Sequence, residues 1–222
     1  MKNDVDSLNK FSRQTWILIS KIEKLSDLFI EKYQDKVDWA TISRYQELSE
    51  QFIEKFKDRV DWGAISSSQK LSEAFIKKYK DKIDWNIISW RQKLSEPFIE
   101  RYKDNVDWDG ISYHQKLSEP FIEKYKDKVC WGGISASQEL SEAFIRKYKD
   151  NINWGSISIH QKLSESFIIK MKKYIFFESI KTIRLTPNII NNCYEYINKD
   201  LVKDKLNNKD ILPEVKLYYG VK

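Results

Sequence analysis

The sequence predicts an all-α fold, an α-solenoid of stacked, short antiparallel helix pairs with 23 residues per repeat. Three observations predict it: a tryptophan recurs every 23 residues, apolar residues within each copy follow helical spacing, and the 222 residues include only 6 glycines and 4 prolines. Of the 8 tryptophans, only Trp90 falls outside the series. The series consists of Trp16, Trp39, Trp62, Trp85, Trp108, Trp131 and Trp154.

The repeats divide the chain into three parts. Residues 1–24 form an N-terminal cap with a half repeat, residues 25–184 form seven tandem repeats, and residues 185–222 form a degenerate repeat, a C-terminal cap and a tail. The seventh repeat is degraded, because Met171 and Phe177 stand where the pattern has tyrosine and tryptophan. The repeats begin at Leu25, Leu48, Leu71, Leu94, Leu117, Leu140 and Leu163.

The first helix of each repeat follows the opening leucine. In one repeat, Ser118 is placed to cap this helix and Glu119 lies in its first turn, where the helix dipole favours a negative charge. Pro97 and Pro120 fall in the same first turn, where a missing N–H costs little. The predicted apolar stripe consists of Leu117, Phe121, Ile122, Tyr125 and Val129.

The second helix begins at the series tryptophan and ends near the glutamine that precedes the next repeat. Trp108 and Ile111 share a face of this helix, and we expect the series tryptophans to be core residues. Helices of about 8–11 residues are marginal alone, so stacking must stabilise them. The predicted N-caps are Asp38, Asp61, Asp84 and Asp107.

Cys130 occupies the N-cap position that aspartate holds in four earlier repeats. A thiol at a helix N-terminus can be reactive, but no base stands beside Cys130 in the sequence. Cysteine caps poorly, so we interpret Cys130 as a substituted cap that costs about 1 kcal/mol. The second cysteine, Cys193, lies too far along the chain to form a metal-binding spacing with it.

Composition indicates a structured protein, with 41% hydrophobic, 32% charged and 14% aromatic residues. No apolar run is long enough for a signal peptide or a membrane span, so we expect a cytoplasmic protein that does not contact a membrane. The net charge of +6 is concentrated at one end, because residues 169–222 hold 11 Lys and Arg against 6 Asp and Glu. The main body is nearly neutral, which favours a solvated mixed-charge surface over a phosphate-binding stripe.

The repeats lay each residue type out as a row, whereas catalysis needs different types to converge on one point. We interpret the rows of Asp and Glu as helix caps and solvent-face ion pairs. His114 and His160 lie two repeats apart, too far to share a metal ion. No nucleotide-binding, hydrolase or zinc-protease motif occurs. We therefore predict no catalytic, cofactor-binding or metal-binding residues, no cofactor and no enzymatic activity.

Two positions near the end of the second helix vary between repeats, as recognition surfaces on regular scaffolds do and as neutral drift also produces. Trp90, Arg91, Tyr113 and His114 occupy these positions in adjacent repeats and combine aromatic and basic groups, which are enriched in binding hot spots. We expect stacking to place them on one ridge, with Trp90 partly exposed. Replacing Trp90 with alanine should then change stability by no more than about 1 kcal/mol. If Trp90 instead fills a gap between repeats, the same replacement should destabilise the protein by several kcal/mol.

The phrase LSEPFIEKYKDKVDWDGIS and its sister copies resemble short tandem-repeat proteins that giant amoeba-infecting viruses of the mimivirus type carry in multi-gene families. The resemblance covers roughly residues 25–180. It implies an α-helical repeat array in the cytoplasm of an infected cell. No activity is assigned to that family, so the resemblance brings no site residues.

Three classes of function remain open. The first is a non-enzymatic repeat scaffold that binds a protein partner, because extended solenoid surfaces suit partner chains. The second is a nucleic-acid-binding repeat protein that uses the basic C-terminal region and the aromatic rows. An enzyme is the third, and nothing in the sequence converges to support it. The partner and the oligomeric state are not readable from the sequence.

Overall fold

The computed structural model describes residues 10–22, 24–179 and 185–220. Every regular element in these ranges is a helix, and helix pairs repeat with the 23-residue period, so the predicted α-solenoid is confirmed. The first nine residues of the expected N-terminal cap, residues 180–184 at the end of the seventh repeat, and residues 221–222 of the expected tail lie outside the described ranges.

The first helices of the repeats are one and a half turns long, and serine caps each of them. Ser118, for example, accepts a hydrogen bond from the backbone N–H of Phe121, and Glu119 opens the first turn, as predicted. Pro97 and Pro120 occupy that turn without breaking it. These helices are α3 (Asp27–Lys32), α5 (Glu50–Lys55), α7 (Glu73–Lys78), α9 (Glu96–Arg101), α11 (Glu119–Lys124), α13 (Glu142–Lys147) and α15 (Glu165–Lys170).

The second helices begin at the series tryptophans, and the predicted aspartates cap them. The side chains of Asp38, Asp61 and Asp84 each accept a hydrogen bond from the backbone N–H three residues on. Cys130 occupies the cap position of its helix and makes no side-chain cap hydrogen bond, as expected for a substituted cap. These helices are α4 (Trp39–Tyr45), α6 (Trp62–Ser68), α8 (Trp85–Arg91), α10 (Trp108–His114), α12 (Trp131–Ser137) and α14 (Trp154–His160).

The helices are shorter than the sequence led us to expect. First helices have 6 residues and second helices 7, instead of 8–11. The predicted stripe from Leu117 to Val129 is continuous in packing but not in helix, because α11 ends at Lys124. Backbone hydrogen bonds from Val129 to Tyr125 and from Tyr125 to Phe121 carry it through a turn. Part of each segment that we had predicted to be helical is therefore formed by turns.

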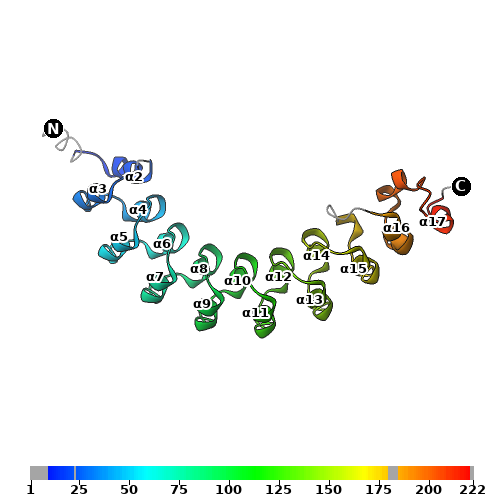
Figure 1. Cartoon of the computed structure of the whole chain (residues 1–222). Helices are drawn as coiled ribbons and strands as arrows, with labels where there is room; N and C mark the ends of the chain where they lie inside the picture. The colour runs from blue at the N-terminus through cyan, green and yellow to red at the C-terminus, as the bar shows by residue number, and fades with distance from the viewer. Residues whose placement is uncertain (1–9, 23, 180–184, 221–222) are drawn as a thin grey trace. The chain divides into compact units, whose positions relative to one another are not determined.

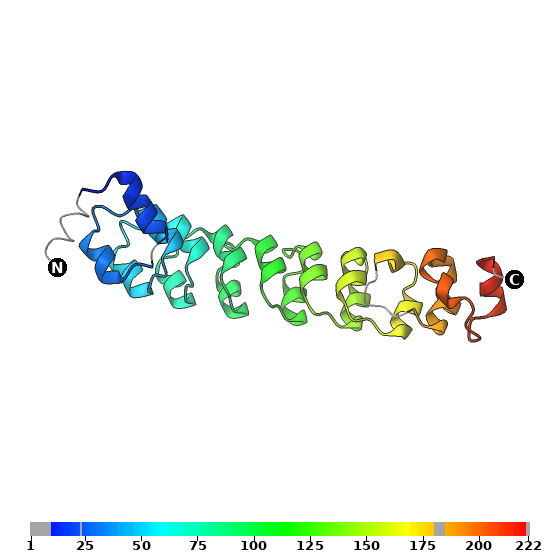
Figure 2. The ribbon, with the colours of Figure 1, turned by 90° about the horizontal axis from the view of Figure 1, so that it is seen from above.

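The chain forms two units, residues 1–115 and residues 116–222. In unit 1, α2 (Arg13–Ile22), α4, α6, α8 and α10 contact one another in order and form one row, and α3, α5, α7 and α9 form a second row beside it (Figure 1). Within this unit, the row of second helices lies on the inner side of the curve. Viewed from above, the helices run across the direction of the rows (Figure 2).

The C-terminal part of unit 2 departs from the regular pattern of helix pairs. In the described part of the seventh repeat, a 3₁₀ turn, η1 (Phe177–Ser179), lies where the other repeats begin a second helix. Beyond it lie α16 (Pro187–Cys193), η2 (Tyr194–Tyr196), η3 (Lys199–Leu201), η4 (Lys203–Lys205) and α17 (Pro213–Tyr218). Thr186 caps α16, and Tyr219 donates its hydroxyl hydrogen bond to the carbonyls of Tyr194 and Ile197, which ties α17 back to η2.

Isoleucines, not tryptophans, form the center of the core. One isoleucine in each regular helix is at most 1% exposed, for example Ile53 and Ile65. Trp16 is buried, but the other series tryptophans are only half-buried, so our assignment of them as core residues was partly wrong. The indole of Trp85 packs against Phe98 and Tyr102 of the next repeat and donates to a backbone carbonyl five residues earlier. In this position the half-buried ring covers the edge of the core.

A row of buried glutamines joins neighbouring repeats, and the sequence reasoning missed it. The Gln69 side chain accepts a hydrogen bond from the backbone N–H of Leu48 at 3.0 Å and donates to the carbonyls of Gln46 and Ser43 at 2.8 and 2.9 Å. Gln92 repeats the same pattern one repeat later. Buried polar groups need such partners, so each glutamine fixes the distance and register between two repeats.

A row of buried serines adds a second set of bonds between repeats. Ser43 donates to the Trp39 carbonyl and accepts from the backbone N–H of Asp61, the cap of the next second helix. Ser66 and Ser89 do the same for their neighbours.

The charged rows are ion pairs, as predicted, but most of them run between repeats and not along one helix. Glu54 pairs with Lys78, and Asp58 with Lys82, each 24 residues apart. Lys147 and Glu123 form the equivalent pair in unit 2, and each side chain is about half exposed. Exposed pairs of this kind contribute little stability each.

Candidate binding surface

The variable positions predicted from the sequence lie at the C-terminal ends of the second helices. In unit 1 the row of these helices follows the inner side of the curve (Figure 1). Trp90 and Arg91 end α8, and Tyr113 and His114 end α10. All four side chains are exposed. The constant residues of the same helices instead face the core, where Ile88 and Ser89 have no exposed surface.

The structure brings the predicted aromatic residues together. The ring of Trp90 lies 4.9 Å from that of His114 and 6.1 Å from that of Tyr113, and the planes of Trp90 and Tyr113 differ by only 16°. Trp90 is 41% exposed and Tyr113 40% exposed, which confirms the expected partial exposure of Trp90. We name these three residues together with Arg91 the Trp90 cluster.

Trp90 also makes contacts with the next repeat, in line with the alternative that it fills a gap between repeats. Its indole Nε1 donates to Oδ2 of Asp107 at 2.5 Å, while Oδ1 of the same carboxylate accepts from the backbone N–H of Asp109. The indole lies directly over Gly110, where a Cβ atom would stand 2.5 Å from Trp90 Cδ1. Trp90 is therefore both exposed and held in a fixed position.

A pocket of about 580 Å³ opens beside the Trp90 cluster. It lies along three successive second helices, and Arg91 and His114 contribute cationic or ionisable groups to its wall. Three of its residues, Ser67, Asn86 and Ile87, were not singled out from the sequence, because nothing in a single copy marks them. The pocket is lined by Ser67, Asn86, Ile87, Trp90, Arg91 and His114.

Arg91 has no ion-pair or hydrogen-bond partner among the described residues, and no carboxylate lines the pocket. The nearby aspartates are engaged elsewhere: Asp84 caps α8, and Asp107 binds Trp90 and the start of α10. Unit 1 as a whole carries 20 Lys and Arg against 20 Asp and Glu. The positive charge of Arg91 is therefore a feature of this surface alone and does not reflect a net positive charge of unit 1.

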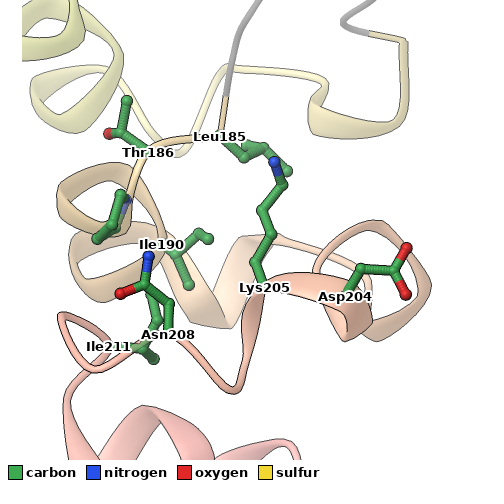
Figure 3. Close-up of a pocket in the computed structure, with 8 residues that line it drawn as sticks. Leu185, Thr186, Ile190, Asp204, Lys205, Asn208 and Ile211 are labelled. Carbon is green, nitrogen blue, oxygen red and sulfur yellow. The ribbon is translucent and has the colours of Figure 1, made fainter.

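A second pocket, of about 330 Å³, lies near the C-terminus (Figure 3). Aliphatic residues Leu185, Ile190 and Ile211 form much of it, Lys205 extends toward Leu185, and Asp204 points away. Nothing in its lining combines a nucleophile with a base or gathers metal ligands.

Cys193 and His160, which the sequence also singled out, lie in unit 2. Cys193 is buried, and burial raises the pKa of its thiol to about 11, so the thiolate that reacts is scarce at neutral pH. His160 ends α14 and lines a shallow pocket with Ala136 and Gln161. Within residues 10–22, 24–179 and 185–220, no group of three or more His, Cys, Asp or Glu is arranged to hold a metal ion.

Comparison with known proteins adds no family: no family model, no curated protein and no solved structure matches the chain. Across the part of the chain that the structure describes, no helix has the length and apolar character needed to cross a membrane.

Proposed function

We propose that this protein is a non-enzymatic repeat scaffold that binds a protein partner through the Trp90 cluster, in the cytoplasm. One observation carries the proposal: the constant residues of each repeat hold the repeats together, whereas Trp90, Arg91, Tyr113 and His114 gather at an exposed surface beside a pocket. Aromatic residues and arginine are the side chains most enriched in binding hot spots. Solenoids present such surfaces over several adjacent repeats.

The chemistry of the pocket supports binding more than catalysis. Ser67 and His114 line the same pocket, but the Ser67 hydroxyl donates to the Ala64 carbonyl at 3.0 Å. A nucleophile and its base need a hydrogen bond to each other, and none joins these two residues in the described structure.

Nucleic-acid binding is the second candidate, and one observation favours it: residues 116–222 carry 19 Lys and Arg against 13 Asp and Glu. The aromatic rows support it less. The half-buried series tryptophans pack against the next repeat, as Trp62 does against Phe75 and Tyr79. The indole N–H of Trp62 donates to the backbone carbonyl five residues earlier in the chain. Stacking on bases needs an open ring face.

The resemblance to the tandem-repeat proteins of mimivirus-type viruses fits this proposal. We propose that the chain is a member of that group on the strength of the repeated phrase itself, which recurs with few changes from residue 25 onward.

Comparative affinity capture tests the proposed function. The full chain and two variants are used as bait in expressing cells, and the bound proteins are quantified by mass spectrometry. Arg91→Ala and Lys77→Ala each remove one exposed positive charge from the last turn of a short helix, so they form a matched pair. A partner of the proposed surface is lost with Arg91→Ala and retained with Lys77→Ala.

A protein set that is the same for all three baits would refute the proposed surface. Binding of single-stranded DNA or RNA that is strong at 50 mM salt and falls by orders of magnitude at 200 mM salt would instead support the second candidate.

A further inference from the structure

We infer that the pocket between α6, α8 and α10 is the specificity site of this surface, and that it takes a large apolar side chain of a partner peptide with an acidic residue beside it. This inference rests on the proposed function and adds the chemistry of the partner. It follows from how side chains of successive second helices cover one another.

The residue five positions after a series tryptophan lies over the residue two positions after the next one. Trp90 covers Gly110 in this way. Arg44 and Ala64 hold the same two positions two repeats earlier, and they line one pocket together. Ser67 and Ile87 are the intervening pair, and they also line one pocket.

The sizes of these pairs explain why a pocket opens at Ser67. A large indole meets a glycine at Trp90 and Gly110, and the two fit without a gap. At Ser67 a small side chain meets a larger one, Ile87, so none of the residues that the structure describes fills the space above the isoleucine. The volume of about 580 Å³ is in the range of small-ligand sites. The pocket thus offers an apolar floor, Ile87, and an aromatic wall, Trp90.

The positive charge of the pocket determines which residue of the partner peptide can stand next to its apolar residue. Arg91 is the one cation of its lining without any partner in the described structure, and an arginine fork matches a carboxylate in two hydrogen bonds. His114 adds a further donor on the same wall. A carboxylate beside the apolar anchor would meet a complementary charge, whereas a lysine there would be repelled.

A peptide fits these observations better than a nucleic acid. Unit 1 has no net charge, so it offers a polyanion no general attraction. One ring face of Trp90 is already stacked toward Tyr113, which leaves room for a single anchor and not for a run of bases.

The test is a selection of random nine-residue peptides, displayed on phage, against the full wild-type chain and against Ser67→Phe. The phenyl group of Ser67→Phe should cover Ile87 as Trp90 covers Gly110, so it closes the pocket while keeping Trp90, Arg91 and His114. We expect peptides enriched only on the wild type to carry a large apolar residue next to Asp or Glu. Synthetic copies should bind at least ten-fold more weakly to Ser67→Phe.

Arg91→Ala serves as a second variant, since Arg91 is exposed and makes no hydrogen bond or ion pair with the described residues. The synthetic peptides should lose at least ten-fold in affinity for Arg91→Ala and should bind Lys77→Ala like the wild type. Replacing their Asp or Glu with Asn or Gln should abolish the difference between wild type and Arg91→Ala.

Three results would overturn the inference. If the enriched peptides contain no acidic residue but bind Trp90→Ala weakly, the proposed partner chemistry is refuted and the proposed surface is supported. Peptides that bind Trp90→Ala, Arg91→Ala and Ser67→Phe like the wild type, or no enriched peptide at all, would refute the inference and the proposed surface together. Displacement of the peptides by a 20-nucleotide oligo-dT at 50 mM salt would assign the pocket to nucleic acid.

Discussion

The indole of Trp90 lies so close over Gly110 of the next repeat that a Cβ atom there would stand 2.5 Å from Trp90 Cδ1. Real Cβ atoms do not approach other atoms so closely, so the two residues fit only as a pair. The same indole donates to Asp107, the N-cap of the helix that contains Gly110. The one tryptophan outside the 23-residue series is therefore fixed by two residues of its neighbour.

This pair predicts a change of sign in a double-mutant cycle. Gly110→Ala should destabilise the wild type by about 1–3 kcal/mol, because the new methyl group displaces the indole. In a Trp90→Ala background, the same change should stabilise by about 0.5–1 kcal/mol, the usual gain of alanine over glycine in a helix. Urea denaturation of the four proteins measures both values.

Gly63→Ala is the control for that cycle, because the nearest atom to its Cβ would be an Asp61 carboxylate oxygen at 3.3 Å and not a ring. Its effect should be the same with and without Trp90. Equal effects of Gly110→Ala in both backgrounds would show that Trp90 does not rest on Gly110 in solution.

The buried glutamines predict a second effect on stability. Gln69→Leu keeps most of the side-chain volume but removes the acceptor for the Leu48 N–H and the donor to the carbonyls of Gln46 and Ser43. We expect a loss of about 2–4 kcal/mol, because a buried N–H is left without a partner. As a control, Gln51→Leu at an exposed position of α5 should change stability by less than about 0.5 kcal/mol. Chemical denaturation decides, and a loss for Gln69→Leu as small as that of the control contradicts the assigned role.

The cap position of α12 predicts a stabilising change. Asp61 shows what an acidic cap does in the equivalent position, where it accepts from the Ala64 N–H at 2.7 Å. Cys130→Asp should restore this bond and raise the free energy of unfolding by about 1 kcal/mol. The reverse change, Asp61→Cys, should lower it by a similar amount. Both are read from thermal melts, and a destabilising Cys130→Asp would indicate that the thiol makes a contact worth more than a cap.

Asp38 predicts a dependence of stability on pH. The hydroxyl of Thr41, then its backbone N–H, hold the pKa of Asp38 below its ordinary value against the opposing effect of burial. A lowered pKa in the folded state means that this stabilisation is present above the unfolded pKa, about 3.9, and is lost as the pH falls through the folded value.

Asp38→Asn can still cap α4 but cannot titrate, so it isolates the ionised form. The wild type should be more stable than Asp38→Asn at pH 7, and the difference should vanish as the pH falls toward 2. Urea denaturation between pH 2 and pH 7 measures it. A difference that does not change with pH would contradict the assignment.

The fold was predictable because each repeat carries its own signals. Serine and aspartate caps, prolines in the first turn and helical apolar spacing all describe a single copy, and six undamaged copies confirmed one another. Helix lengths were overestimated, since residues such as Val129 keep helical spacing through a turn that bonds back to Tyr125. Periodicity alone does not distinguish those two conformations.

The contacts between repeats were less predictable. Gln69 recurs unchanged in its position in every regular repeat, a signal that was available, but its bonds to Leu48 and Gln46 exist only after two repeats stack. The Trp90 cluster was found because its residues break the pattern. The pocket beside the cluster was not predicted, because it arises from the space between Ser67 and Ile87, which exists only in the folded structure.

The central claim is that the variable ends of α8 and α10 bind the partner while the constant residues hold the solenoid together. Hydrogen-exchange mass spectrometry of the full chain, with and without a partner obtained by the capture described above, tests it most directly. We predict added protection in Trp85–Arg91 and Trp108–His114 and unchanged exchange in the outer helices Glu50–Lys55 and Glu73–Lys78. Added protection confined to the outer helices, or to residues 169–222, would contradict the claim.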